Sequence, residues 1–232
     1  MSTRTPHVQA TETPADRSIV AGSSVETADR ARAVFGQVMG LVALTLGCLA
    51  LGAYLGRDLS GGIGIACFVG GFACVFGLNF AAARGHDQLS TTLLFGLGIL
   101  LGLALGPVLN AYAQADPSAL WQAAGTTAAF VAALGAYGYG TRRDLSGWGR
   151  GLFWALIGLI AFGIVALLVS IPHENVIWSV AGIVIFGGFT IVDFNRLRRA
   201  GRESAVPIAA SIFLDILNVF LFALQLFSGG RD

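Results

Sequence analysis

The stretch that decides the fold is the last apolar run, residues 206–227, which reads VPIAASIFLDILNVFLFALQLF. It is long enough to cross the hydrocarbon core of a bilayer as one helix, which takes about 20 mostly apolar residues. Its one charged residue is Asp215. Comparable apolar runs recur along most of the chain, so the sequence predicts a helical membrane protein.

The composition agrees with this prediction. Hydrophobic residues make up 55% of the 232 residues and charged residues only 12%, whereas soluble domains carry about 25% charged residues. The three cysteines lie in apolar runs without CxxC spacing, which indicates neither a disulfide framework nor a zinc site. Phosphate-binding glycine motifs and nucleic-acid signatures are absent, so we expect no cofactor and no nucleic-acid partner. We expect the lipid bilayer to surround the protein.

We predict an all-α integral membrane protein with seven transmembrane helices. The polar residues 1–33 contain no apolar run and are predicted to form a disordered cytoplasmic tail, followed by a seven-helix transmembrane domain over residues 34–228. The predicted spans are 34–56, 61–83, 89–113, 119–140, 151–171, 176–194 and 206–227.

The arginines predict the orientation of the helices. All fourteen basic residues are arginines, and cytoplasmic loops carry an excess of such residues. Arginines that would lie on one side of the membrane are Arg30, Arg32, Arg84, Arg142, Arg143, Arg150, Arg196, Arg198, Arg199 and Arg202, against Arg57 and Arg231 on the other. We therefore expect a multi-pass protein of the inner (plasma) membrane, with a cytoplasmic N-terminus and a periplasmic or extracellular C-terminus.

An internal repeat is suggested by two loops, because residues 57–61 and 143–147 both read RDLSG. These positions would correspond if helices one to three and four to six were inverted repeats, a common plan among transporters. The alternative is that Asp and Ser simply cap the helices that follow.

Small residues and a proline mark the third span. Gly98, Gly102 and Gly106 are spaced by four residues, which is typical of a face that lets helices approach closely in lipid. Pro107 should kink this helix and free a backbone carbonyl, which makes it a candidate gating hinge.

Two aspartates, Asp193 and Asp215, lie inside the last two apolar runs. A carboxylate at membrane depth costs about 2.5–3.5 kcal/mol on insertion scales, so it usually marks a pathway, a proton relay or a tight polar contact. In the predicted topology both fall in the cytoplasmic half of adjacent antiparallel helices. If they meet, they should share one proton: the protonated pair would be a hydrogen-bonded latch, and the ionised pair would repel itself or recruit a cation such as Ca²⁺.

Two side chains are candidates for supporting this pair. Arg84, at the inner end of the second span, is a candidate counter-charge for Asp193, and Asn218, one turn beyond Asp215, can donate a hydrogen bond to its carboxylate. The structural alternative is that the carboxylates merely bridge helices, through hydrogen bonds of about 0.6 kcal/mol each, or that Asp193 pairs with Arg196.

The residues around both aspartates resemble those of a known family. Residues 211–221, SIFLDILNVFL, and 190–195, TIVDFN, look like the last-helix and sixth-helix motifs of the Bax inhibitor-1 (transmembrane Bax inhibitor motif) family, and residues 128–149 resemble the middle of its bacterial members. The resemblance implies a bundle in which six helices wrap around a central C-terminal helix. It also implies a pH-dependent Ca²⁺ leak with Asp193 and Asp215 as latch and transient Ca²⁺ ligands, and no enzymatic activity.

The sequence departs from the family pattern at three positions. Val192 stands where the sixth-helix motif often has Tyr, Phe213 replaces the usual Tyr of the seventh, and Gln225 stands where a basic residue is frequent. The first two changes remove hydroxyl groups that could support the latch.

Two other functions compete with the leak. Similarity to bacterial relatives suggests an interaction protein that modulates a membrane-bound AAA quality-control protease, which could engage the tail 1–33. An intramembrane aspartyl protease would also place two aspartates on successive helices. Those proteases carry Gly-x-Gly-Asp, whereas Asp215 follows Ile212-Phe213-Leu214, so we disfavour this alternative.

Overall fold

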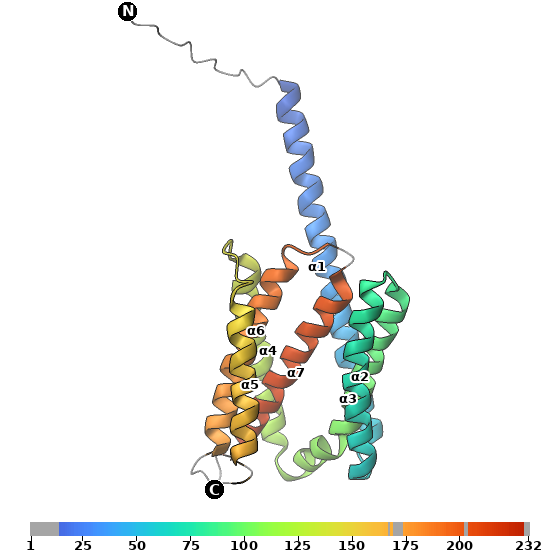
Figure 1. The fold of residues 1–232 in the computed structure, drawn as a ribbon, viewed down its shortest axis with the longest axis vertical. Helices are drawn as coiled ribbons and strands as arrows, with labels where there is room; N and C mark the ends of the chain where they lie inside the picture. Colours follow the sequence, from blue (N-terminus) through green and yellow to red (C-terminus); the bar gives the residue numbers. More distant parts are fainter. Residues whose placement is uncertain (1–13, 167, 169–173, 202–203, 230–232) are drawn as a thin grey trace, which may run out of the picture.

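The computed structural model describes residues 14–166, 168, 174–201 and 204–229, with side chains from residue 29 onward except those of residues 30 and 174. This part of the chain folds into seven helices (Figure 1). The helices are α1 (Pro14–Gly56), α2 (Gly61–Ala83), α3 (Asp87–Ala115), α4 (Pro117–Gly140), α5 (Trp148–Ala166), α6 (Glu174–Leu197) and α7 (Ala205–Ser228).

Each predicted span coincides with one of these helices, and all seven are long and apolar enough to cross a membrane. The all-α, seven-span fold class is therefore confirmed. The start of the first helix differs from the expectation, because α1 begins at Pro14 and residues 14–33 are helical rather than a disordered tail. This segment contains five Ala and three Arg among its 20 residues, and both residue types favour helices. Residues 1–13, the end of the predicted fifth span, Arg202 and Arg231 lie outside the described residues.

The C-terminal helix α7 lies in the centre of the bundle. It buries a larger share of its membrane window than any other described span, 56%, and Ile208, Ile212 and Phe213 are at most 1% exposed. It packs against α6, α4 and α1 and also contacts α2 and α3, whereas α5 packs mainly against α6. The expected arrangement around a central C-terminal helix is thus present, with α5 as an outer helix.

The remaining helices form two groups with the same order of packing. In the first group α3 packs against both α1 and α2, and in the second α6 packs against both α4 and α5. Figure 1 shows α7 running obliquely between the two groups. In both groups the third helix packs between the other two, as a repeat of three helices would require. The inverted repeat stays a prediction.

The glycine face of α3 is where α1 approaches most closely. A Cβ atom placed on Gly106 would lie 2.6 Å from the carbonyl carbon of Gly56, and one on Gly98 would lie 2.7 Å from the carbonyl oxygen of Thr45. Only a hydrogen fits at these positions. The small-residue face predicted from the sequence therefore serves the packing of α1 on α3.

Pro107 lies inside α3, which continues past it to Ala115. Beyond the proline, the last turns of α3 run obliquely across the base of the bundle toward α4 (Figure 1). There Leu109 and Tyr112 pack against a small cluster that includes Ala223 and Leu224 of α7. The proline thus lies at the point where α3 leaves α1 and reaches the far end of α7.

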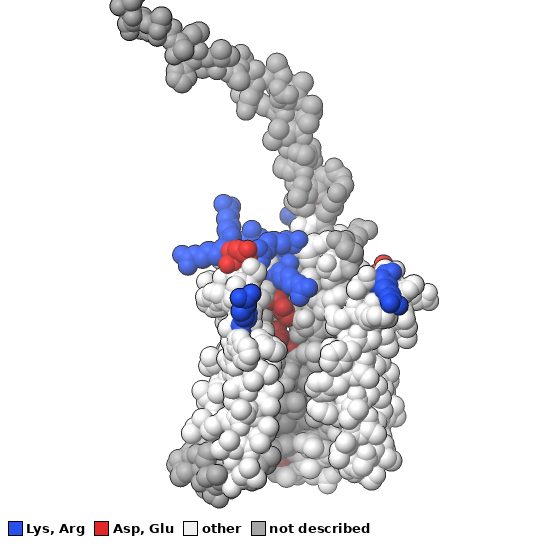
Figure 2. Space-filling view, viewed as in Figure 1, with Lys and Arg blue, Asp and Glu red and all other residues white. Residues whose placement is uncertain are grey.

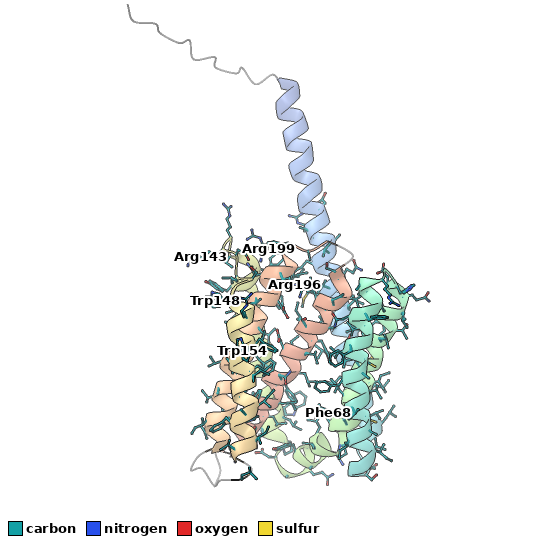
Figure 3. The ribbon with its side chains drawn as sticks, in the orientation of Figure 1. Phe68, Arg143, Trp148, Trp154, Arg196 and Arg199 are labelled. Atoms are coloured by element: carbon teal, nitrogen blue, oxygen red, sulfur yellow. The ribbon has the colours of Figure 1, made fainter. Side chains whose placement is uncertain are left out.

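The two ends of the bundle differ in charge. Figure 2 shows the basic side chains gathered at the end from which α1 projects, which we call the arginine-rich end. Arg143, Arg196 and Arg199 lie there (Figure 3), and the exposed Trp148 is close by at the start of α5. Arginines gathered at one end of a helical bundle, with an aromatic side chain nearby, are typical of a membrane–water boundary.

Candidate functional site

Asp215 is the buried acidic group of the central helix. It lies on α7 in the half nearer the arginine-rich end, and its residue is only 5% exposed. Its Oδ2 atom is buried and has no hydrogen-bond partner within the described part of the chain. A buried polar atom without a partner costs about 1–3 kcal/mol, and more when the group is charged. Such an atom calls for a proton, a cation or a movement of the helices.

Asp193 approaches this group from α6. The Ser211 hydroxyl on α7 and the charge of Arg196 on its own helix both act on its carboxylate. The charge of Asp193 in turn acts on Asp215. The structure thus brings the two aspartates together as electrostatic neighbours across the α6–α7 contact, with Ser211 between the helices.

The two predicted supporting residues lie elsewhere. Arg84 is exposed at the end of α2, with its guanidinium 3.8 Å from the centre of the Phe80 ring, and the cation that acts on Asp193 is Arg196 instead. Asn218 donates its amide hydrogen bond to the Leu214 carbonyl oxygen at 2.7 Å. The backbone carbonyl one turn back competes successfully for this short side chain. Among the described residues no hydrogen bond joins Asn218 to Asp215, so support of the carboxylate by Asn218 stays a prediction.

A residue whose role the sequence did not reveal, Asn195, holds the end of α6 in place. Its side chain is 2% exposed and joins α6 to the segment that follows α4. Its Oδ1 atom accepts from the Leu145 backbone N–H at 3.3 Å and from the Arg199 side chain at 2.7 Å. Its Nδ2 atom donates to the backbone carbonyl oxygens of Gly138 (3.2 Å), Arg143 (3.1 Å) and Thr141 (3.5 Å).

Two arginines reinforce this contact from the same helix end. Arg198 donates to the carbonyl oxygen of Thr141, and Arg199 forms an ion pair with Asp144 at 2.8 Å. The Ser146 backbone N–H and the Arg199 side chain lower the pKa of Asp144 to about 2. Asp144 is therefore ionised at every physiological pH, and the loop between α4 and α5 stays attached to α6.

Glycines of α4 complete the attachment of α6. A Cβ atom on Gly138 would lie 3.0 Å from the Ile191 Cα atom, and one on Gly135 would lie 3.0 Å from the Phe194 ring. Residues 191 and 194 flank Asp193 on either side, so the backbone around this aspartate is fixed against α4. The α6–α7 contact, which holds the aspartates, contains no comparable set of hydrogen bonds among the described residues.

The described residues contain no group of three or more His, Cys, Asp or Glu side chains that could hold a metal ion. Ca²⁺ takes 6–8 oxygen ligands, so two carboxylates could supply only part of a coordination shell.

These features define a class: a polytopic helical membrane protein with two acidic side chains between its central helix and a neighbour. Residues 31–232 match the family described as "Inhibitor of apoptosis-promoting Bax1". The chain belongs to this Bax inhibitor family, which confirms the resemblance found in its sequence.

Several bacterial relatives are similar over 61–82% of this chain. The inner membrane protein YbhL of Escherichia coli K12 is 33% identical over 155 residues, which cover 61% of this chain and 64% of YbhL. A protein of Helicobacter pylori is 31% identical over 160 residues, covering 68% and 69% of the two chains. A protein of Chlamydia muridarum is 29% identical over 210 residues, covering 82% and 85%.

Proposed function

We propose that this protein is a pH-sensitive leak pathway for Ca²⁺ or similar cations, with Asp193 and Asp215 as its gate. The observation that carries the proposal is the buried Asp215 carboxylate of the central helix, which has Asp193 beside it and one oxygen without a hydrogen-bond partner among the described residues. Ionisable groups at this depth are expensive and mark ion or proton pathways in membrane proteins.

The proposed gate works by loss of a proton. At low pH the two carboxylates share a proton and hold α6 against α7; at higher pH both are ionised and repel one another in a medium of low dielectric constant. Because Asn195 and the glycines of α4 fasten α6 to α4, the contact between α6 and α7 is the one that yields. The exposed oxygens then attract a cation. In this proposal the two aspartates act as a gate and not as catalytic groups.

Pro107 is the proposed second moving part. The oblique end of α3 contacts the far end of α7 through Leu109 and Tyr112. A proline lacks the N–H that would complete the helix at this point, so the segment beyond it can tilt with α7 without breaking a further backbone hydrogen bond.

Calcium flux into proteoliposomes tests the gate. We expect flux in the wild type to rise at least about tenfold from about pH 5 to about pH 8. Each pH unit changes the ratio of protonated to ionised carboxyl groups tenfold. Asp215→Asn and Asp193→Asn each remove one of the two carboxylates whose repulsion opens the gate, and should flatten the rise. Asp58→Asn changes an exposed acidic residue at the opposite end of the bundle and serves as the control. An unchanged pH profile in Asp215→Asn would contradict the proposal.

A second candidate function is an interaction protein, and the projecting part of α1 favours it. Figure 1 shows α1 extending well beyond the other helices at the arginine-rich end, where a membrane-bound AAA protease could engage it. Deleting residues 1–28 should then abolish binding to the protease and leave cation flux unchanged. Binding that survives the deletion would exclude this form of the interaction.

A further inference from the structure

A long apolar groove runs between α1 and α4, with α7 as its floor. Its volume is about 900 Å³, and it exists because α1 and α4 both pack against α7 without packing closely on each other. On α1 its lining extends from Arg32 to Ala53, which at 1.5 Å per residue is about 30 Å, the thickness of the hydrocarbon core. The α1 wall of the groove is therefore about as long as the hydrocarbon core is thick, whereas one acyl chain reaches only about half that depth.

The α4 wall of the groove consists mainly of small side chains. Ala124, Ala128, Ala132 and Ala136 recur at every fourth position, and all of them line the groove and are exposed. Rows of small residues at this spacing are what allows transmembrane helices to approach one another closely. Within the described part of the chain, no helix occupies this row.

A polar side chain without a partner lies on the same wall. Four other helical threonines (Thr45, Thr91, Thr92 and Thr190) donate their hydroxyl hydrogen bonds to the carbonyl four residues earlier. Thr127 lines the groove and is 3% exposed, yet its buried Oγ1 atom makes no hydrogen bond with any described residue. Helical threonines use two χ1 rotamers, so the hydroxyl of this groove-lining residue can turn toward a polar group that is placed in the groove. Hydrocarbon chains offer no partner at this depth, but a polar helix residue does.

The arginine-rich end of the groove carries a cation. Arg32 lines the groove, its side chain is 84% exposed, and its contact with Asp29 is a long one of 3.9 Å. An exposed pair of this kind contributes little, so Arg32 remains available to an acidic residue of a partner. Transmembrane helices usually carry basic residues at their cytoplasmic end. A partner helix with an acidic residue at that end would therefore differ from most others.

We propose that this groove binds one transmembrane helix of another membrane protein. The partner helix has a Gly, Ala or Ser face at four-residue spacing, a polar side chain near mid-membrane facing Thr127, and an acidic residue at the end that reaches Arg32. The small side chains of α4 set the distance, Thr127 sets the depth and Arg32 sets the direction. This inference does not depend on the leak proposed above.

Two designed transmembrane peptides test the proposal by energy transfer to the labelled full-length protein in liposomes. One has a Leu background with an Ala/Gly face, a central Ser and a Glu at one flank; the other replaces the face and Ser by Leu. We expect the first to bind at least about tenfold more tightly. Ala132→Phe fills the groove and should remove this difference, whereas Ala133→Phe, on an exposed position outside the lining, should leave it intact. Thr127→Val should weaken binding about threefold, the typical effect of one interhelical hydrogen bond in lipid.

Three results would overturn the proposal. The first is equal binding of the two peptides, or binding that Ala132→Phe does not change. The second is a wild-type dimer that Ala132→Phe dissociates, which would make the occupant a second copy of this chain. The third is a co-purified phospholipid that the first peptide cannot displace and Ala132→Phe releases. Ala128→Phe replaces Ala132→Phe if the latter fails to give a folded protein by its thermal unfolding.

Discussion

Asn195 shows how much of the site depends on a single amide. Its side chain connects the end of α6 to the backbone of residues 138–145, two positions away from Asp193. Because all of its backbone partners lie on a segment some 50 residues earlier, it fixes the backbone around the aspartate without touching the carboxylate. We regard it as the main positioning residue of the site.

Asn195→Ala should destabilise the protein. The substitution leaves the Leu145 N–H and the Gly138 carbonyl oxygen without their side-chain partner in a buried setting, at a cost of about 1–3 kcal/mol. We expect a lower temperature of thermal unfolding in detergent micelles. Asn79→Ala is the control, because Asn79 is exposed and bonds only within its own helix, to the Val75 carbonyl oxygen. Equal unfolding temperatures for both variants would contradict this role.

Asp144 should contribute to stability without contributing to pH sensing. Its pKa in the folded protein is about 2, below its ordinary value of 3.8, so its stabilising contact with Arg199 is fully present above about pH 4 and is lost as the pH falls toward 2. The difference in unfolding temperature between wild type and Asp144→Asn should be constant from about pH 8 to about pH 5 and shrink below about pH 4. A difference that changes between pH 5 and 8 would count against this assignment.

The sequence indicated some of these residues and not others, for a physical reason. Asp193 and Asp215 stand out because a carboxylate inside an apolar run is costly wherever the helices pack. Asn195 looks like an ordinary polar residue next to the arginines, since its partners are backbone groups that only the fold brings near. The choice of Leu214 over Asp215 by Asn218 likewise depends on rotamers that spacing alone does not determine.

At the scale of helices, close approach through glycine holds α1 and α3 together. Gly106→Ala should lower stability by about 1–3 kcal/mol, the usual cost of overpacking, because the new Cβ atom would meet the Gly56 backbone at 2.6 Å. Gly47→Ala on α1, where nothing lies within 4 Å of a new Cβ atom, is the matched control. The comparison uses the unfolding temperatures of the two variants. A Gly106→Ala protein as stable as Gly47→Ala would show that α1 and α3 can separate freely.

The spans themselves follow from the sequence because the bilayer imposes their length. Predicted and observed limits of the second span agree at both ends, Gly61 and Ala83. The expectation failed for residues 14–33, where polarity was taken as a sign of disorder although the Ala and Arg residues of this segment also favour a helix outside the membrane. Hydropathy reports what lies in lipid, and helix propensity reports what continues beyond it.

For the molecule as a whole, the arginine-rich end should face the cytoplasm. Cys48, Cys67 and Cys74 are first replaced by Ala, and single cysteines are introduced by Ser60→Cys or Ser146→Cys, which lie in exposed loops at opposite ends. A membrane-impermeant maleimide should label Ser60→Cys in intact cells and Ser146→Cys only after permeabilisation. The reverse pattern would invert the proposed orientation.

The arrangement of the seven helices was less accessible to sequence reasoning than their number. The central place of α7 was predicted from the family resemblance. The apolar runs of α7 and α2 look alike in sequence, yet 56% of the α7 window is buried against 11% of the α2 window. The groove between α1 and α4 could not be foreseen, because it depends on two helices that are far apart in sequence and do not meet. Long-range packing of this kind leaves no local pattern.

Infrared titration of the protein in lipid bilayers tests the central claim most directly, because a protonated carboxyl group has its own C=O absorption. The account predicts a protonated-carboxyl band that disappears as the pH is raised from about 5 to about 8, that is absent in Asp215→Asn, and that is unchanged in the control Asp58→Asn. A wild-type protein without such a band over this range, or a band that persists in Asp215→Asn, would contradict the claim that Asp193 and Asp215 share a proton that controls the pathway.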